Sequence, residues 1–315
     1  MSAIFENLFN MLGGLGLFLL GVREMTQSLE QISGSFVTRV IDKFTKNKYM
    51  AAFIGFLVTV LVQSSSAVTV IVVGMVDAGL MALNQAAGVI MGANIGTTVT
   101  SLIIAINLLG LAPLFIFLGV IFVLFKNKFL RTFGSILTGF GVLFLGMNMM
   151  SKAAKPVSNL PIVKEFLMSF NNPLIGVLFG ITFTAIVQSS SVSIGILEAL
   201  GFAGAISFRN AAFIIYGQNI GTCVTALIAA FGAGKTAKRT VAIHFLFNII
   251  GAVLFMGLTL FTPLLQILES IFAQNIMFQI SALHILFNLI STVILLPFSD
   301  VLIKLACKII PDKKN

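Results

Sequence analysis

Charged side chains are scarce in this chain. Asp, Glu, Lys and Arg make up 9% of its 315 residues and apolar residues make up 58%, whereas a soluble domain carries about 25% charged residues. So few charges cannot cover a water-facing surface. Several apolar runs also approach or exceed the roughly 20 residues that a helix needs to cross a bilayer. The composition therefore predicts an all-α integral membrane protein. The clearest runs are 8–22, 101–125, 133–150, 240–262 and 278–298.

Residues typical of metal sites and enzyme active sites are also few. The two cysteines and two histidines form no cluster, so we expect no disulfide, no transition metal and no resident cofactor. The sequence shows no Ser/His/Asp arrangement, paired carboxylates or nucleotide-binding loop, which argues against an enzyme and against an ATP-driven pump. The net charge of +9 comes from short basic clusters between apolar runs. Such clusters are typical of cytoplasmic loops, so we expect no nucleic-acid partner.

The chain contains an internal repeat. Shifting the sequence against itself by 125 residues aligns two halves without a gap, which indicates gene duplication. Aligned pairs include Gly14 with Gly139, Gly21 with Gly146, Gly55 with Gly180, Gly79 with Gly204, and Gly92 with Gly217. We therefore expect a first repeat (1–132), a second repeat (133–262), an additional transmembrane helix (263–298) and a short basic cytoplasmic tail (299–315).

A Gln-Ser-Ser-Ser tetrad lies within an apolar segment of each repeat. Its hydroxyls and amide can bind an oxyanion, or coordinate Na⁺ through oxygen. A helix that begins at the serines would point free N–H groups at an anion, and the carbonyls that end the preceding helix would suit a cation. Small residues also let helices pack closely, but two copies in register favour a binding role. The copies are Gln63, Ser64, Ser65 and Ser66, and Gln188, Ser189, Ser190 and Ser191.

A second polar motif follows each tetrad. It reads Gly-Ala-Asn-Ile-Gly-Thr-Thr from Gly92 and Gly-Gln-Asn-Ile-Gly-Thr-Cys from Gly217. Glycine permits a break in the backbone, so we expect a broken transmembrane helix in each repeat, with close packing as the alternative. Oxygens of Asn and Thr are suitable ligands for a hard cation. The candidate Na⁺ ligands are Asn94, Thr97, Thr98, Asn219, Thr222 and Thr225, together with Ser65 and Ser190.

Some single residues are further candidates. Arg209 could attract an anion, and an arginine that anchors a helix end is an equally good interpretation. Glu198 aligns with Val73 and has no acidic counterpart, so we treat it as a weaker candidate for cation or proton coupling. Spacing of four residues places two His/Asn pairs on helix faces, where interhelical hydrogen bonding is favoured over ligand contact. These pairs are His244 with Asn248, and His284 with Asn288.

The path of the tetrad segments through the membrane has two interpretations. Residues 50–76 and 174–200 are either re-entrant helical hairpins with serines at the tips or single crossing helices. Both interpretations place 15 basic residues on one side of the membrane and four on the other, so both put the N-terminus outside and the C-terminus in the cytoplasm. Hairpins would make the repeats inverted. We favour hairpins, because adjacent serines suit a cavity better than a lipid-facing helix.

The paired motifs resemble those of the type II sodium/phosphate cotransporters. Each tetrad is followed by Gly-x-Asn-Ile-Gly-Thr, and the segments Ser207-Phe208-Arg209 and 242–248 also fit the family pattern. The resemblance covers residues 10 to about 298. Thr98 of the first repeat corresponds to Cys223 of the second, so we do not expect the two repeats to use this position in the same way.

The resemblance implies uptake of inorganic phosphate driven by inward Na⁺ flow in a cell or inner membrane. The tetrads and Arg209 would then bind phosphate, and the Asn and Thr residues would support Na⁺ sites. Bacterial relatives often continue into a domain resembling PhoU, so we expect such a regulator, where one acts, as a separate protein. The sequence is compatible with a homo-oligomer and does not specify the number of subunits. The alternatives are a carrier for sulfate or a carboxylate, a proton-coupled phosphate carrier, and a membrane protein that transports nothing.

Overall fold

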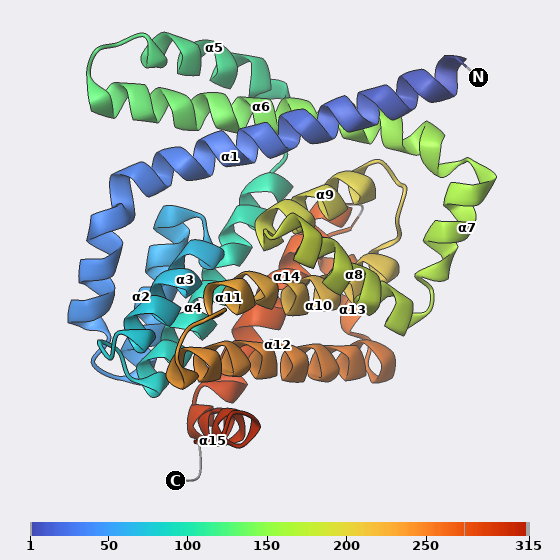
Figure 1. Ribbon diagram of the computed structural model, residues 1–315. Coiled ribbons are helices and arrows are strands. Elements are labelled where there is room, and N and C mark those ends of the chain that lie inside the picture. Colours follow the sequence, from blue (N-terminus) through green and yellow to red (C-terminus); the bar gives the residue numbers. More distant parts are fainter. Residues whose placement is uncertain (1, 274, 313–315) are drawn as a thin grey trace.

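The computed structural model describes residues 2–273 and 275–312 (Figure 1). Within these ranges the regular elements are fifteen α-helices and one 3-10 helix, and no β-strand is present, as the composition predicts. The helices are α1 (Ser2–Phe44), α2 (Lys48–Val62), α3 (Ser65–Asp77), α4 (Leu83–Ala105), η1 (Leu109–Leu111), α5 (Ala112–Val123), α6 (Lys128–Ser158), α7 (Pro161–Ser169), α8 (Pro173–Val187), α9 (Ser190–Phe202), α10 (Phe208–Gly221), α11 (Cys223–Ala229), α12 (Lys235–Phe261), α13 (Leu264–Ile271), α14 (Ile276–Leu295) and α15 (Ser299–Ile309).

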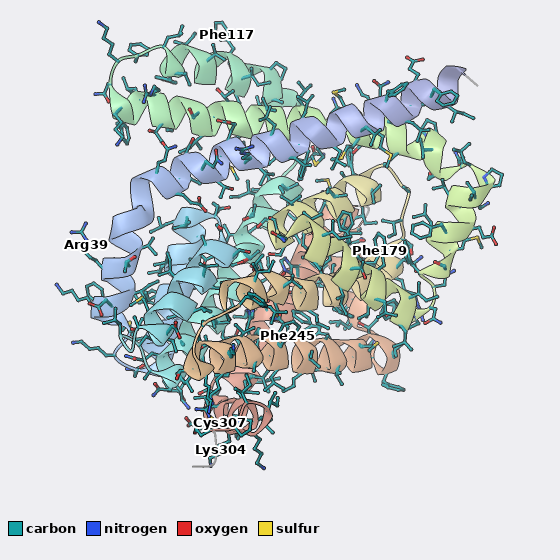
Figure 2. All side chains as sticks on the ribbon, in the orientation of Figure 1. Arg39, Phe117, Phe179, Phe245, Lys304 and Cys307 are labelled. Atoms are coloured by element: carbon teal, nitrogen blue, oxygen red, sulfur yellow. The ribbon has the colours of Figure 1, made fainter. Side chains whose placement is uncertain are left out.

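Six stretches in the described part of the chain are long and apolar enough to cross a membrane. They lie in α1, α4, α6, α10 with α11, α12 and α14. A seventh is added if α7 and α8, which meet at a bend of 103°, count as one span. Apolar side chains such as Phe117 of α5 project from the outside of the bundle (Figure 2). The chain is therefore a multi-pass membrane protein.

Helices α2 and α3 form a helical hairpin whose tip is the first tetrad. Asn47 caps the start of α2 by accepting hydrogen bonds from two backbone N–H groups. The start of α4 lies beside the start of α2, because Gln85 Nε2 donates to Thr45 O at 2.6 Å and Gly88 faces Lys48 O. Since α3 connects the far end of α2 to this point, α3 runs back along α2. The two arms have 15 and 13 residues, about 22 and 20 Å.

The second repeat builds the same unit from α8, α9 and α10. Asn172, the equivalent of Asn47, caps α8. Helices α3 and α9 both end in a turn closed by a glycine with positive φ, Gly79 at 73° and Gly204 at 70°, a conformation that other residues adopt with strain. In each turn the following residue donates its N–H to a carbonyl five positions back. The shared turn explains why Ala-Gly recurs at the same offset.

The glycines of the second motif serve close packing. In α4 the helix continues through Gly92 and Gly96 without interruption, so the expected break in the first repeat is wrong. In the second repeat only Thr222 separates α10 from α11, and it keeps helical dihedral angles, φ −57° and ψ −27°. A Cβ at Gly92 would meet Ala52 O, and one at Gly217 would meet Val177 O. Helix backbones approach this closely only where side chains are absent.

The apolar run 101–125 does not form one crossing helix, contrary to expectation. Helix α4 ends at Ala105, and the chain turns at Asn107, whose φ is 56°. Helix α5 begins at Ala112 with Pro113 in its first turn, where a proline costs no hydrogen bond. It then packs antiparallel on α6, with Gly119 against the backbone of Gly134 and Thr138. A local turn therefore divides the apolar run 101–125, which composition alone predicts to be one continuous helix.

Helices α1 and α6 make reciprocal contacts along their length, with α1 crossing α6 in Figure 1. Gly14 lies against the backbone of Gly146, and Gly21 lies against that of Gly139. Shifting Gly14 and Gly21 by 125 gives Gly139 and Gly146, so each residue contacts the counterpart of the other. Contacts of this kind are made across a two-fold axis. The two equivalent helices run antiparallel, because the contacting number rises on one as it falls on the other.

The C-terminal helix α15 is held against the rest of the protein by polar contacts. Lys48 Nζ donates to Pro297 O at 2.8 Å and lies 3.4 Å from Asp300 Oδ2. Arg239 Nη2 lies 2.9 Å from Asp312 Oδ1. These partly exposed ion pairs contribute little stability, up to about 1 kcal/mol each. The tail therefore packs on the ends of α2 and α12.

Candidate transport site

The two tetrads form matching helix breaks. Gln63 and Gln188 end α2 and α8 with left-handed backbone angles, φ 58° in both, and each donates its N–H to the carbonyl four residues back at 2.7 Å. A side-chain-bearing residue in this region costs about 1–2 kcal/mol. Apart from Asn107, these are the two non-glycine residues with positive φ in the described ranges. Strain kept at equivalent positions of two repeats is typical of a functional site.

The serines that follow cap the next helix. Ser64 Oγ accepts from Ala67 N at 3.2 Å, and Ser189 Oγ accepts from Val192 N at 3.3 Å. Because each oxygen receives a hydrogen bond, its own O–H remains a donor. The next two N–H groups, of Ser65 and Ser66 in the first copy, lie in a helix turn that has no intrahelical acceptor for them. Each tip therefore gathers donors and the positive end of a helix dipole, a setting that suits an anion.

The Asn-Ile-Gly-Thr motif lies about one turn from each tip and offers the opposite chemistry. Gly96 packs against Phe56 and Thr59 on α2, the turn before Gln63. Asn94 Nδ2 donates to the carbonyl four residues back, and Thr97 Oγ1 does the same, both at 3.1 Å. Since their donors are used within the helix, the amide and hydroxyl oxygens are left as acceptors.

The second repeat repeats this pattern and extends it. Asn219 Nδ2 and Thr222 Oγ1 each donate, at 2.9 Å, to the carbonyl four residues back. Asn219 Oδ1 also accepts from Asn288 Nδ2 on α14, at 3.2 Å. Asn248 Nδ2 on α12 lies 3.3 Å from Cys223 Sγ. The expectation that the His/Asn pairs form interhelical hydrogen bonds is therefore confirmed for both asparagines.

The environments of the two tips differ. Thr100 Oγ1 donates to Gln63 Oε1 at 2.7 Å, and Gln63 Nε2 donates to Val60 O at the same distance. Gln188 is exposed. Thr225, the equivalent of Thr100, donates instead to Thr222 O at 3.0 Å and lies 3.4 Å from Ser66 Oγ. The repeats therefore share a backbone but use their side chains differently.

The halves of the protein meet at these residues. Ser66 on α3 contacts Thr225 on α11, and Ser101 on α4 donates to Glu198 Oε1 on α9 at 2.6 Å. Each hairpin thus rests on the segment that follows the Asn-Ile-Gly-Thr motif of the other repeat. A movement of one repeat against the other would change both contacts.

Arg209 lies away from the serine tips. It is exposed on the first turn of α10, after the C-terminal end of α9, whereas Ser189 caps the opposite end. The 13 residues of α9 span about 20 Å. The structure therefore does not bring Arg209 together with the tetrads in this conformation.

Sequence reasoning missed several residues at the site. Thr59 and Thr184, which are equivalent, are fully buried and their hydroxyls have no hydrogen-bond partner. Thr100 and Ser101 make the contacts described above. The shared offset of 125 could have revealed Thr59 with Thr184, and Thr100 is the equivalent of Thr225, which the sequence analysis gives as a candidate Na⁺ ligand. Nothing in the sequence marked Ser101, whose equivalent is Ala226.

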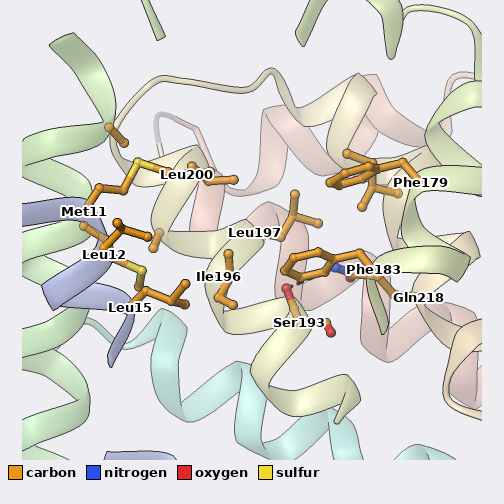
Figure 3. A pocket seen from close by; sticks show the side chains of 14 residues that line it. Met11, Leu12, Leu15, Phe179, Phe183, Ser193, Ile196, Leu197, Leu200 and Gln218 are labelled. Atoms are coloured by element: carbon orange, nitrogen blue, oxygen red, sulfur yellow. Dashed lines mark hydrogen bonds between the residues drawn. The ribbon is translucent and has the colours of Figure 1, made fainter. Parts of the chain in front are cut away.

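An apolar cavity of about 240 Å³ lies beside the second hairpin. Met11, Leu12 and Leu15 of α1 line one side, and Phe179 and Phe183 of α8 line the other (Figure 3). Two polar residues also line it, and Gln218 Nε2 donates to Ser193 O at 3.0 Å. With so few polar groups the cavity is not the ion site itself.

The chain is similar in sequence to several known proteins. "Uncharacterized protein YqeW" of Bacillus subtilis is 32% identical over 298 residues, 94% of this chain and 96% of that protein. "Putative inorganic phosphate export protein YjbB" of Escherichia coli K12 is 29% identical over 251 residues, 79% of this chain and 46% of that protein. Rat "Sodium-dependent phosphate transport protein 2A" is 43% identical over 99 residues, 30% of this chain and 15% of that protein.

No solved structure matches the chain. The profile of the Na⁺/Pi-cotransporter family matches residues 17–152 and 161–262, which cover most of both repeats, both tetrads and both Asn-Ile-Gly-Thr motifs. The chain belongs to the Na⁺/Pi-cotransporter family.

Proposed function

We propose that the protein is a secondary transporter that couples inorganic phosphate to Na⁺ by alternating access. The observation that carries this proposal is the division of hydrogen-bonding capacity around each tip. The capping serines present O–H and N–H donors, and the Asn-Ile-Gly-Thr motifs one turn away present acceptor oxygens. Donors suit a phosphate oxyanion and acceptors suit Na⁺. Family membership places the chain among transporters, not enzymes.

In this proposal the tetrads form the phosphate site. Ser64 and Ser189 hold phosphate through their hydroxyls, and the N–H groups of the next two residues add to the site. The glutamines set the position of each tip. Arg209 contributes at most long-range attraction in this conformation. The Na⁺ sites comprise Asn94, Thr97 and Thr98, their counterparts Asn219, Thr222 and Thr225, and the hydroxyls of Ser65 and Ser190.

The two hairpins are proposed to be re-entrant, with inverted repeats. Each arm spans about 20 Å, which is shorter than the roughly 30 Å of a hydrocarbon core. The antiparallel packing of α1 on α6 supports inversion. If both helices cross the membrane, a two-fold axis that relates antiparallel helices lies in the membrane plane. For the repeat boundaries we propose those expected from the sequence, residues 1–132 and 133–262.

The direction of transport is set by the gradients, because a secondary carrier is reversible. The name of the Escherichia coli relative refers to phosphate export, and that of the rat relative to sodium-dependent transport. We propose uptake in a plasma or inner membrane, with the N-terminus outside and the C-terminus in the cytoplasm. A homo-oligomer and a separate PhoU-like regulator fit this proposal.

Reconstitution in liposomes tests the proposal. Radioactive phosphate uptake is measured with an inward Na⁺ gradient and again with K⁺ in place of Na⁺, and efflux is measured from preloaded vesicles. We expect uptake that requires Na⁺ and falls strongly in Ser65→Ala and in Ser190→Ala. Ser270→Ala, at an exposed position of α13, is the matched control. Uptake that ignores Na⁺ contradicts the coupling, and sulfate transport without phosphate transport contradicts the substrate.

A further inference from the structure

Glu198 is a carboxyl group enclosed within the bundle. The residue is 0% exposed, and it lies midway along α9. Its Oε1 lies 2.6 Å from Ser101 Oγ on α4, and its Oε2 has no hydrogen-bond partner. Among the described side chains no Lys, Arg or His forms an ion pair with it. An ionised carboxylate without a counter-charge is very costly in such a place, so the group must hold a cation or a proton.

The other repeat shows that the fold does not require this carboxyl. The counterparts of Glu198 and Ser101 are Val73 and Ala226, which pack in one apolar cluster with Ala230. The same contact between hairpin and facing helix is therefore polar in one repeat and apolar in the other. Nothing in the packing of α9 calls for an acid at this position, which points to a role in transport.

The charged groups around Glu198 leave it without a fixed counter-charge. Helix α9 packs against α1, α4, α6, α8, α10 and α14. Helices α4 and α8 carry no ionisable side chain, and α14 carries His284, which is buried. On α10, Arg209 is exposed, and the Tyr216 hydroxyl bonds to Thr259. The charged side chains described on α1 and α6 are exposed, except for half-buried Glu30.

The oxygen set favours a proton over a metal ion. Na⁺ requires several oxygen ligands, and Ser101 Oγ is the one non-carboxylate side-chain oxygen bonded to Glu198 in the described structure. A proton needs only one carboxylate oxygen. Ser101 Oγ donates to Oε1 when the carboxyl is ionised. When Oε1 carries the proton, the direction of this bond reverses: Oε1 donates to Ser101 Oγ, and Oε2 remains as a carbonyl-type acceptor, the cheaper group to leave unpaired.

We propose that Glu198 is a proton-binding site that links the transport cycle to protons, an inference that rests on the proposed transport function. The carboxyl holds its proton while α9 lies against α4. When the repeats separate and water reaches the group, the proton leaves to water and the carboxylate remains, solvated. Rebinding of a proton from water precedes return to the packed conformation.

Infrared spectroscopy of the purified protein in lipid tests proton binding without relying on transport. We expect a carbonyl band of a protonated carboxyl that is present at neutral pH and declines as the pH is raised. The band should vanish in Glu198→Gln and persist in Glu269→Gln, a change at an exposed glutamate of α13. Absence of the band at every pH, a band that never titrates, or a band lost on adding Na⁺ at fixed pH overturns the proposal.

Transport measurements test the link to the cycle. Glu198→Gln mimics the protonated group and cannot release a proton. Phosphate exchange between two loaded states should stay near the wild-type rate, whereas net uptake should fall at least about fivefold, the lower end of ordinary coupling between sites. Equal loss of both activities, or loss of neither, overturns the link. The double variant Glu198→Val with Ser101→Ala copies the Val73–Ala226 contact and should fold and behave like Glu198→Gln. If the wild type moves no phosphate, the proposed function fails, and the infrared result still decides proton binding.

Discussion

A methyl group added at Gly96 is expected to damage both stability and transport. The new Cβ would lie 2.6 Å from Thr59 Cβ and 2.8 Å from Phe56 O. Carbon atoms pack best at about 3.5–4.0 Å, so α2 and α4 must separate by about 1 Å. Overpacking of this size costs about 1–3 kcal/mol, offset in part by a gain of up to about 1 kcal/mol from replacing glycine in a helix.

The effect on transport should exceed the effect on stability. Gly96 lies between Asn94 and Thr97, and the separation moves both residues relative to the Gln63 tip. A misplacement of 1 Å can reduce the rate of a positioned reaction by about 100-fold. We therefore expect phosphate uptake to fall at least about tenfold, and the unfolding temperature in detergent to fall by a few degrees. Gly221→Ala should act similarly, since its Cβ would lie 2.9 Å from Thr184 Cβ.

Gly74→Ala is the matched control. Gly74 lies in α3, and a Cβ there meets nothing within 4 Å. Helix propensity predicts an unchanged or raised unfolding temperature and normal uptake. If Gly96→Ala behaves like Gly74→Ala, the close approach of α2 to α4 does not hold the second motif in place, and the reasoning is refuted.

Three further variants probe the site. Thr100→Val removes the 2.7 Å hydrogen bond to Gln63 Oε1, which is worth about 1 kcal/mol, so phosphate uptake should fall roughly fivefold. Thr182→Val, at an exposed position, is the control and should keep the wild-type uptake rate. Equal uptake by the two variants would contradict a role for this hydrogen bond. Asn219→Ala should raise the Na⁺ concentration for half-maximal uptake by about tenfold, and an effect on phosphate alone would argue against a Na⁺ ligand. Arg209→Gln should weaken phosphate uptake only at low ionic strength, because an exposed charge is screened by salt, and a defect that persists at high salt would indicate direct contact.

Much of the local structure could be predicted from the sequence. Asn47 and Asn172 signal helix starts, and the glycines at 79 and 204 signal turns that need positive φ. The tetrads lie at helix breaks because a capping serine starts a new helix directly after each strained glutamine. These features depend on neighbours in the chain, and the offset between the repeats doubles the signal.

Contacts between distant helices could not be predicted in the same way. Glycine at position 92 fits either a broken helix or a close approach, and only the position of Ala52 decides between them. The pairing of Glu198 with Ser101 depends on which face of α9 meets α4. The different surroundings of Gln63 and Gln188 likewise depend on packing, because Thr100 donates to Gln63 whereas its equivalent Thr225 donates to Thr222 O. Such information resides in tertiary packing.

The reciprocal glycine contacts between α1 and α6 also bear on how the duplicated gene evolved. A contact in which Gly14 meets the counterpart of Gly21, and Gly21 meets the counterpart of Gly14, is one that two copies of a single half could make before fusion. In an antiparallel pair those copies would sit in the bilayer in opposite senses. If the repeats are inverted as proposed, the ancestor of this chain was a small protein that inserted in both orientations and dimerised with itself, and fusion of its gene would have fixed one copy in each orientation. The glycines that let the helices touch would be the remnant of that dimer interface.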